Sequence, residues 1–140
     1  MLSIKSKWTK GMSFDIQSDD GNVIKMGAGN EEGMSPMKAL LGALSGCSAI
    51  DVIAILKRYV EDGSLKSLNV DAEGIRAEGH PQYYTDITLT FHIEGDVPEK
   101  RIWKAMRQSE EKFCSVRASL KSNVILKLIL NGVAIQEDSV

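Results

Sequence analysis

The feature that most constrains the fold of this chain is one long apolar segment with the pattern of a buried helix. The segment runs from Gly33 to Leu56, and the pair Ser35-Pro36 stands near its start. A serine can accept hydrogen bonds from the first free backbone amides of a helix, and proline fits the first helical position without losing a bond. We therefore predict a helix from Pro36 to about Val60 that is apolar on nearly every face and enclosed by other elements.

Two glycines lie one helical turn apart inside this predicted helix. Each of them, Gly42 and Gly46, costs about 1 kcal/mol relative to alanine in a helix interior, so we expect something to approach that face closely. One interpretation is a strand or a second helix packed against the glycines. The alternative is a small-molecule pocket beside Cys47, lined by Gly42, Gly46 and Asp51.

Length and composition set broad limits on what the chain can be. It has 140 residues, which predicts a single domain over residues 1–140, and its 43% hydrophobic and 26% charged residues are ordinary for a globular protein. A formal net charge of −2 offers no basic patch for a phosphate backbone, so we expect no nucleic-acid partner. The first residues contain lysines but no apolar segment of a secretory signal, so we expect a cytoplasmic protein.

The long apolar stretch also has to be weighed as a membrane span. Asp51 lies well inside it, and glycines and serines dilute it, so we expect no membrane association.

The remaining chain reads as strands and helices in a mixed order. Three short strands precede the long helix, two strands and a second helix follow it, and a shorter helical piece and a closing strand come last. The predicted strands are Leu2–Trp8, Ser13–Gln17, Asn22–Met26, a strand through Leu68 and Ala77 with a bulge at Gly74, Asp86–Glu94 and Val124–Leu130; the later helices are Pro98 to about Cys114 and Ser115–Leu120. This order predicts an α+β fold with antiparallel sheets packed on two main helices.

Two cysteines are the residues most able to carry chemistry. Cys47 and Cys114 are 67 positions apart, so their spacing neither joins nor separates them. Each can be a buried, inert small side chain, or a reactive thiolate that a nearby positive charge stabilises. Asp51 is one turn after Cys47, where it would raise a thiol pKa or hold an arginine, and Arg117 follows Cys114 by three residues, where it can stabilise either thiolate or lie in solvent.

Metal and cofactor motifs are not recognisable in the sequence. His80 lies in a turn beside a proline, and His92 lies on the polar face of a predicted strand. Together with the two cysteines they match no known ligand spacing, and the glycines between Gly27 and Gly33 do not match a nucleotide-binding loop. We therefore expect neither a metal nor a cofactor.

Several blocks of the sequence, taken together, resemble a known family. They cover most of the chain: residues 35–37, 42–47 and 51–56 around the first cysteine, 76–81 and 91–95 in the middle, and 111–116 around the second cysteine. In this order they resemble the OsmC-like family of osmotically inducible and organic hydroperoxide resistance proteins.

This resemblance implies an intertwined α+β homodimer with cysteine sites near the subunit interface, and thiol peroxidase chemistry. The catalytic residues would be Cys47, which attacks the hydroperoxide, and Cys114, which condenses with the resulting sulfenic acid. An external dithiol would then reduce the disulfide.

The sequence departs from the family where the thiolate is activated. Active members carry a glutamate at the start of the cysteine helix that pairs with an arginine, and here Met37 and Lys38 stand in that region. The activating cation would therefore be Lys38, Arg117 or another lysine.

Three hypotheses follow from these observations. The first is a peroxidase that reduces organic or inorganic hydroperoxides through Cys47 and Cys114. The second is a noncatalytic, stress-associated dimer that binds a small apolar or thiol-bearing molecule beside Gly42 and Gly46. The third is a redox sensor in which the same disulfide alters the binding of a partner.

Overall fold

The computed structural model describes residues 1–29 and 31–138 in two compact units, of which the first ends at Leu40 and the second begins at Leu41. The expectation of a single domain stays a prediction. Helix α1 (Pro36–Ile55) begins in the first unit and continues into the second. The Lys38 backbone N–H donates to the Ser35 hydroxyl at 3.3 Å, which confirms the predicted helix cap.

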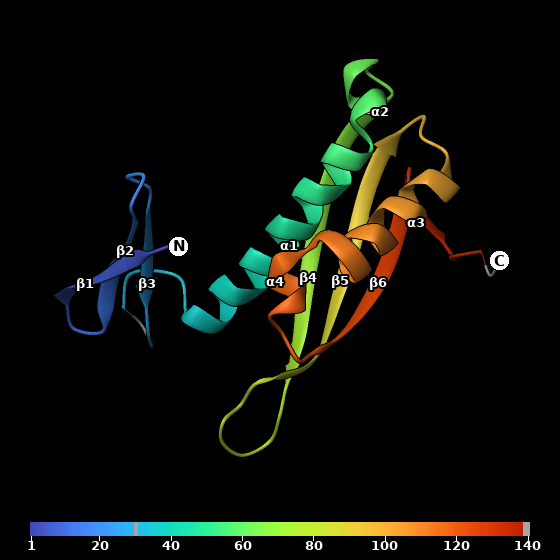
Figure 1. The fold of residues 1–140 in the computed structure, drawn as a ribbon. Coiled ribbons are helices and arrows are strands. Elements are labelled where there is room, and N and C mark those ends of the chain that lie inside the picture. The colour runs from blue at the N-terminus through green and yellow to red at the C-terminus, as the bar shows by residue number, and fades with distance from the viewer. Residues whose placement is uncertain (30, 139–140) are drawn as a thin grey trace. The chain divides into compact units, whose positions relative to one another are not determined.

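The N-terminal unit holds a three-stranded antiparallel sheet, drawn in blue in Figure 1. Its strands are β1 (Ile4–Lys10), β2 (Ser13–Ser18) and β3 (Val23–Gly27), paired in the order β1-β2-β3. This confirms the predicted meander. Several large apolar side chains of the sheet are exposed, among them Ile4, Trp8 and Ile24.

The second unit is built on a four-stranded sheet. Its strands, in the order β4-β5-β6-β7, are β4 (Leu65–Arg76), β5 (Tyr84–Gly95), β6 (Asn123–Leu130) and β7 (Val133–Ile135). The expectation of purely antiparallel sheets is wrong for one pair, because β5 and β6 run parallel. The long helical crossover between these strands returns the chain to the same end of the sheet, which is what a parallel pair requires.

The crossover consists of three helical pieces on one side of the sheet (Figure 1). They are α3 (Glu99–Gln108), the π-helix η1 (Ser109–Phe113) and α4 (Ser115–Ala118). After α1, the break at Leu56 separates a short helix α2 (Lys57–Glu61), so the single helix predicted to Val60 is in fact two. The α+β class is confirmed.

The core of the second unit lies between this sheet and the helices. Alternate residues of β5 are fully buried, as its pattern predicts: Ile87, Leu89, Phe91 and Ile93. In contrast, α1 is buried along one side only, through Leu44, Ser48 and Val52. The prediction that the chain encloses this helix is therefore wrong, because the sheet and the crossover cover only that side.

By length and composition α1 is also apolar enough to cross a membrane, the one such helix among the residues that the structure describes. Core helices of globular proteins meet the same criterion. In this chain α1 is buried along one side, through Leu44, Ser48 and Val52.

The predicted bulge at Gly74 lies one residue further on. Gly74 pairs regularly with Ile87, and the register shifts between Ile75 and Arg76. The glycine has a packing reason instead, because a Cβ atom there would lie 2.5 Å from ring atoms of Tyr84.

We predict that Gly74→Ala lowers the free energy of unfolding by about 1–3 kcal/mol, because the added methyl group overpacks the space beside the Tyr84 ring. Urea unfolding at one fixed protein concentration measures this. In a Tyr84→Leu background the same alanine should cost clearly less. An equal cost in both backgrounds would mean that the ring is not the obstacle.

Candidate functional site

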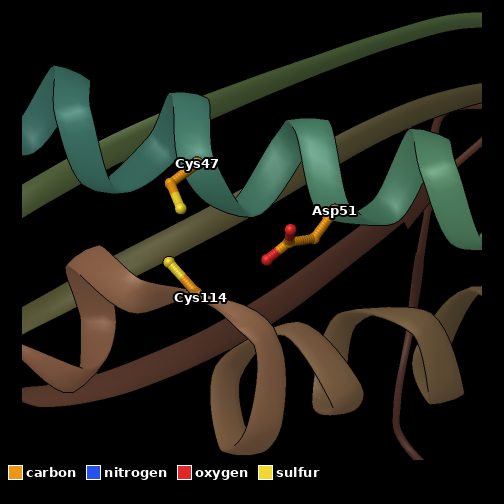
Figure 2. Close-up of side chains that lie close together, drawn as sticks. All are labelled: Cys47, Asp51 and Cys114. Atoms are coloured by element: carbon orange, nitrogen blue, oxygen red, sulfur yellow. The ribbon is translucent and has the colours of Figure 1, made fainter.

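The two cysteines, far apart in sequence, face one another in the second unit. Figure 2 shows the Cys47 side chain pointing from α1 toward Cys114, with the Asp51 carboxylate directed into the same space. The two sulfur atoms and a carboxylate oxygen all lie within 4.8 Å of one another. Both cysteines are free thiols.

Asp51 reaches this cluster because it follows Cys47 by four residues on the same helix, which places both on one face. Its carboxylate accepts a hydrogen bond of 2.9 Å from the hydroxyl of Ser109, a fully buried residue at the start of η1. The Ser109 hydroxyl also lies 3.3 Å from that of Ser48. These contacts tie α1 to the crossover at the cysteines.

The π-helix sets the position of Cys114. The Cys114 backbone N–H donates to the carbonyl of Ser109 at 2.8 Å, five residues back, which is the π-helical pattern. Cys114 then leaves the helix with an extended backbone, and its sulfur accepts a hydrogen bond of 3.3 Å from the backbone N–H of Arg117. Single π-turns are frequent at functional sites.

Burial dominates the electrostatics of Cys114. The residue is 4% exposed, and desolvation of the thiolate raises the pKa of Cys114 to about 11. The backbone N–H of Arg117 opposes that shift, whereas Cys47 and the negative charge of Asp51 add to it. At neutral pH the Cys114 thiol therefore keeps its proton.

The guanidinium of Arg117 is engaged away from the thiols. The guanidinium of Arg117 is engaged by the Glu110 carboxylate, 3.1 Å from Nε, and by the Leu120 carbonyl, 3.2 Å from Nη1. Arg117 thus meets Cys114 through its backbone amide. Lys38 lies in the N-terminal unit, and in the described part of the chain it forms no ion pair.

Access to the two thiols is unequal. The gap beside Cys114, between α1, β5, β6 and the crossover, has no room for a water molecule. Cys47 is only partly buried. On another side of α1, a Cβ atom at Gly42 or Gly46 would have no atom within 4 Å apart from the helix's own backbone, so the glycine face is open in this chain.

Three residues of this site were not candidates from the sequence. Ser48 and Ser109 stand at apolar positions of two helices, where a buried hydroxyl implies a polar partner. Glu110 pairs with Arg117, a contact across seven residues that follows from the π-turn and not from α-helical spacing. His80 and His92 lie outside the cluster.

Comparisons with known proteins agree with this architecture. The OsmC-like protein family matches residues 29–129. Protein YhfA of Escherichia coli is 34% identical over 125 residues, which cover 88% of this chain and 92% of that protein. The chain therefore belongs to the OsmC-like family.

Solved structures extend the comparison. A hypothetical protein from Aquifex aeolicus has a TM-score of 0.83 at 28% identity, over 94% of this chain and 96% of that one. The organic hydroperoxide resistance protein OhrB of Bacillus subtilis has a TM-score of 0.59 at 16% identity, over 94% and 98% of the two chains, and at that identity it shares the fold alone. The fold is thus one that a protein named for organic hydroperoxide resistance shares.

We predict that iodoacetamide at pH 7 modifies Cys47 well before Cys114 in the folded, reduced protein. Cys114 is buried and protonated, and only a thiolate reacts. Peptide mass spectrometry measures both sites. The rate at Cys114 should rise with each pH unit from 7 to 10, because all of that range lies below its pKa of about 11. Equal rates at the two cysteines at pH 7 would contradict the assignment of unequal burial.

Proposed function

We propose that this protein is a two-cysteine hydroperoxide reductase in which Cys47 reacts first and Cys114 second. The observation that carries the proposal is the pair of facing sulfur atoms, within 4.8 Å of each other, of which one is partly accessible and the other buried. Membership of the OsmC-like family, and a fold shared with a protein named for organic hydroperoxide resistance, support it.

The reaction begins at the accessible sulfur. The Cys47 thiolate attacks the distal oxygen of the hydroperoxide, and the electron pair of the O–O bond leaves with the alkoxide, which takes up a proton to become an alcohol. Cys47 is then a sulfenic acid. Its partial burial leaves the Cys47 sulfur accessible to a small hydroperoxide.

The second step uses the buried sulfur. The Cys114 sulfur attacks that of Cys47, the S–O bond breaks, and the hydroxyl leaves as water with the proton of Cys114. The backbone N–H of Arg117 supports negative charge on the Cys114 sulfur in this step. An external dithiol then supplies two electrons and two protons to reduce the disulfide.

Two residues, Arg117 and Lys38, are candidates for the cation that activates Cys47. Arg117 can turn toward the thiols only if it leaves Glu110, which holds its guanidinium. Lys38 stands in the region where active relatives carry the activating glutamate, and within residues 1–29 and 31–138 it forms no ion pair. We also propose that the reaction takes place in the cytoplasm, where free thiols stay reduced.

We predict that purified protein consumes cumene hydroperoxide or hydrogen peroxide with a dithiol as reductant, and that Cys47→Ser reduces consumption to the uncatalysed rate. Cys114→Ser should react once and stop at a sulfenic acid, which a carbon nucleophile traps and mass spectrometry detects. Turnover that persists in Cys47→Ser would refute the mechanism. A wild-type protein that shows no turnover would favour a noncatalytic binding protein instead.

We also propose that the working unit is a homodimer. The open side of α1 presents Gly42, Gly46, Ile50 and Ile53 at helical spacing, and Ile50 is 71% exposed. Such a small and apolar face fits a second copy of the same helix, since small residues allow helices to approach closely. A homodimer would supply the close neighbour that the two glycines predict.

We predict that the wild-type protein elutes as a dimer in size-exclusion chromatography with light scattering, and that Ile50→Glu shifts it toward the monomer. A buried charge without a partner destabilises an interface by several kcal/mol. Val133→Glu on β7, also at an exposed apolar residue, is the matched control and should stay dimeric. A monomeric wild-type protein would contradict the proposal.

A further inference from the structure

The carboxylate of Asp51 has an unusual setting beside two thiols. Its carboxylate accepts a hydrogen bond from the Ser109 hydroxyl, and within residues 1–29 and 31–138 it takes part in no ion pair. The guanidinium of Arg117, on the crossover, is held by Glu110. The cluster of Cys47, Asp51 and Cys114 thus gathers groups that are anionic when deprotonated, without a described cation among them.

We propose that Cys47, Asp51 and Cys114 form a binding site for a thiophilic divalent cation, with Zn²⁺ as the cation that fits the donor set. Two thiolates and one carboxylate supply three protein ligands, and a water molecule can complete a tetrahedron. Zinc would bind the reduced protein in the absence of peroxide, so the test of this site does not depend on whether the protein is a peroxidase.

The geometry of the cluster suits a tetrahedral ion. Ligand sulfur atoms about 2.3 Å from zinc lie about 3.7 Å from one another. The three donor atoms here are already within 4.8 Å of one another, and all three side chains point into one space (Figure 2). Small rotations of side chains therefore suffice to close the site.

The surrounding contacts also suit a metal. The Ser109 hydroxyl orients one carboxylate oxygen of Asp51, as partners behind metal ligands commonly do. Sulfur donors select zinc over magnesium and calcium, which prefer oxygen. The sequence gives no ligand motif, because the third donor lies on a different element, 63 positions after Asp51 (114 − 51).

Binding has a direct chemical consequence. The Cys114 thiol gives up its proton to the solvent when its sulfur bonds to zinc, so the ion replaces at least one proton at the site. A zinc ion bonded to both sulfur atoms also blocks the formation of a disulfide between them. The site therefore cannot hold zinc and contain the disulfide between Cys47 and Cys114 at the same time.

The test is a titration of the reduced, full-length protein with Zn²⁺ alone, in competition with a chromophoric chelator. We expect one ion per chain, and Cys47→Ser should weaken binding by at least about 100-fold, beyond the loss that outer partners usually cause. Asp51→Asn and Ser109→Ala should each weaken it by at least about 10-fold. His92→Ala removes a surface histidine that lies 2.9 Å from Asp71, and it should bind as the wild-type protein does.

A spectroscopic measurement keeps the test independent of folding defects in the variants. Cd²⁺ added to the wild-type protein should give an ultraviolet charge-transfer band of thiolate ligation, and Zn²⁺ should abolish it by competition. Zinc binding without such a band, binding lost in His92→Ala but kept in Cys47→Ser, or no binding at all would each overturn the proposal.

Discussion

The hydrogen bond between Ser109 and Asp51 is the contact on which the cysteine site depends. It joins α1 to the start of the π-helix, and the two cysteines lie on either side of that connection. Ser109 is fully buried and Asp51 is partly buried, so an unpaired hydroxyl or carboxylate there costs more than the bond contributes. The bond therefore fixes which residues of the two segments meet, even though its net stabilisation is modest.

The π-helix determines where Cys114 lies relative to Cys47. By closing a hydrogen bond over five residues instead of four, it delays the end of the crossover helix until Cys114, whose extended backbone then starts α4. The resulting position is dry and close to Cys47. The same arrangement supports two uses of the thiol pair: oxidation to a disulfide, and ligation of a soft cation together with Asp51.

Much of the fold follows from sequence patterns, and its exceptions have physical causes. The helix start at Ser35, the meander and the alternation along β5 are local patterns and were predictable. The parallel pairing of β5 with β6 was not, because it follows from the three-dimensional path of the crossover. The side of α1 with Gly42 and Gly46 was predicted to be buried because its residues are apolar. In this chain that side is open.

The candidate site, like the fold, was predictable from the sequence only in part. Cys47, Asp51 and Cys114 were candidates by residue type, and the spacing within α1 was enough to put the first two on one face. Their approach to Cys114 depends on tertiary packing that no local pattern encodes. The role of Arg117 was the least predictable, since the π-turn pairs its guanidinium with Glu110 and leaves its backbone amide at the sulfur.

The most direct test of this account is peptide mapping, under non-reducing conditions, of the protein after treatment with one equivalent of hydroperoxide. The account predicts a peptide pair linked through Cys47 and Cys114 of the same chain, in a yield that does not change with protein concentration. Two thiols that stay free, or a disulfide that joins Cys47 residues of different chains, would contradict the claim that these cysteines form one functional pair.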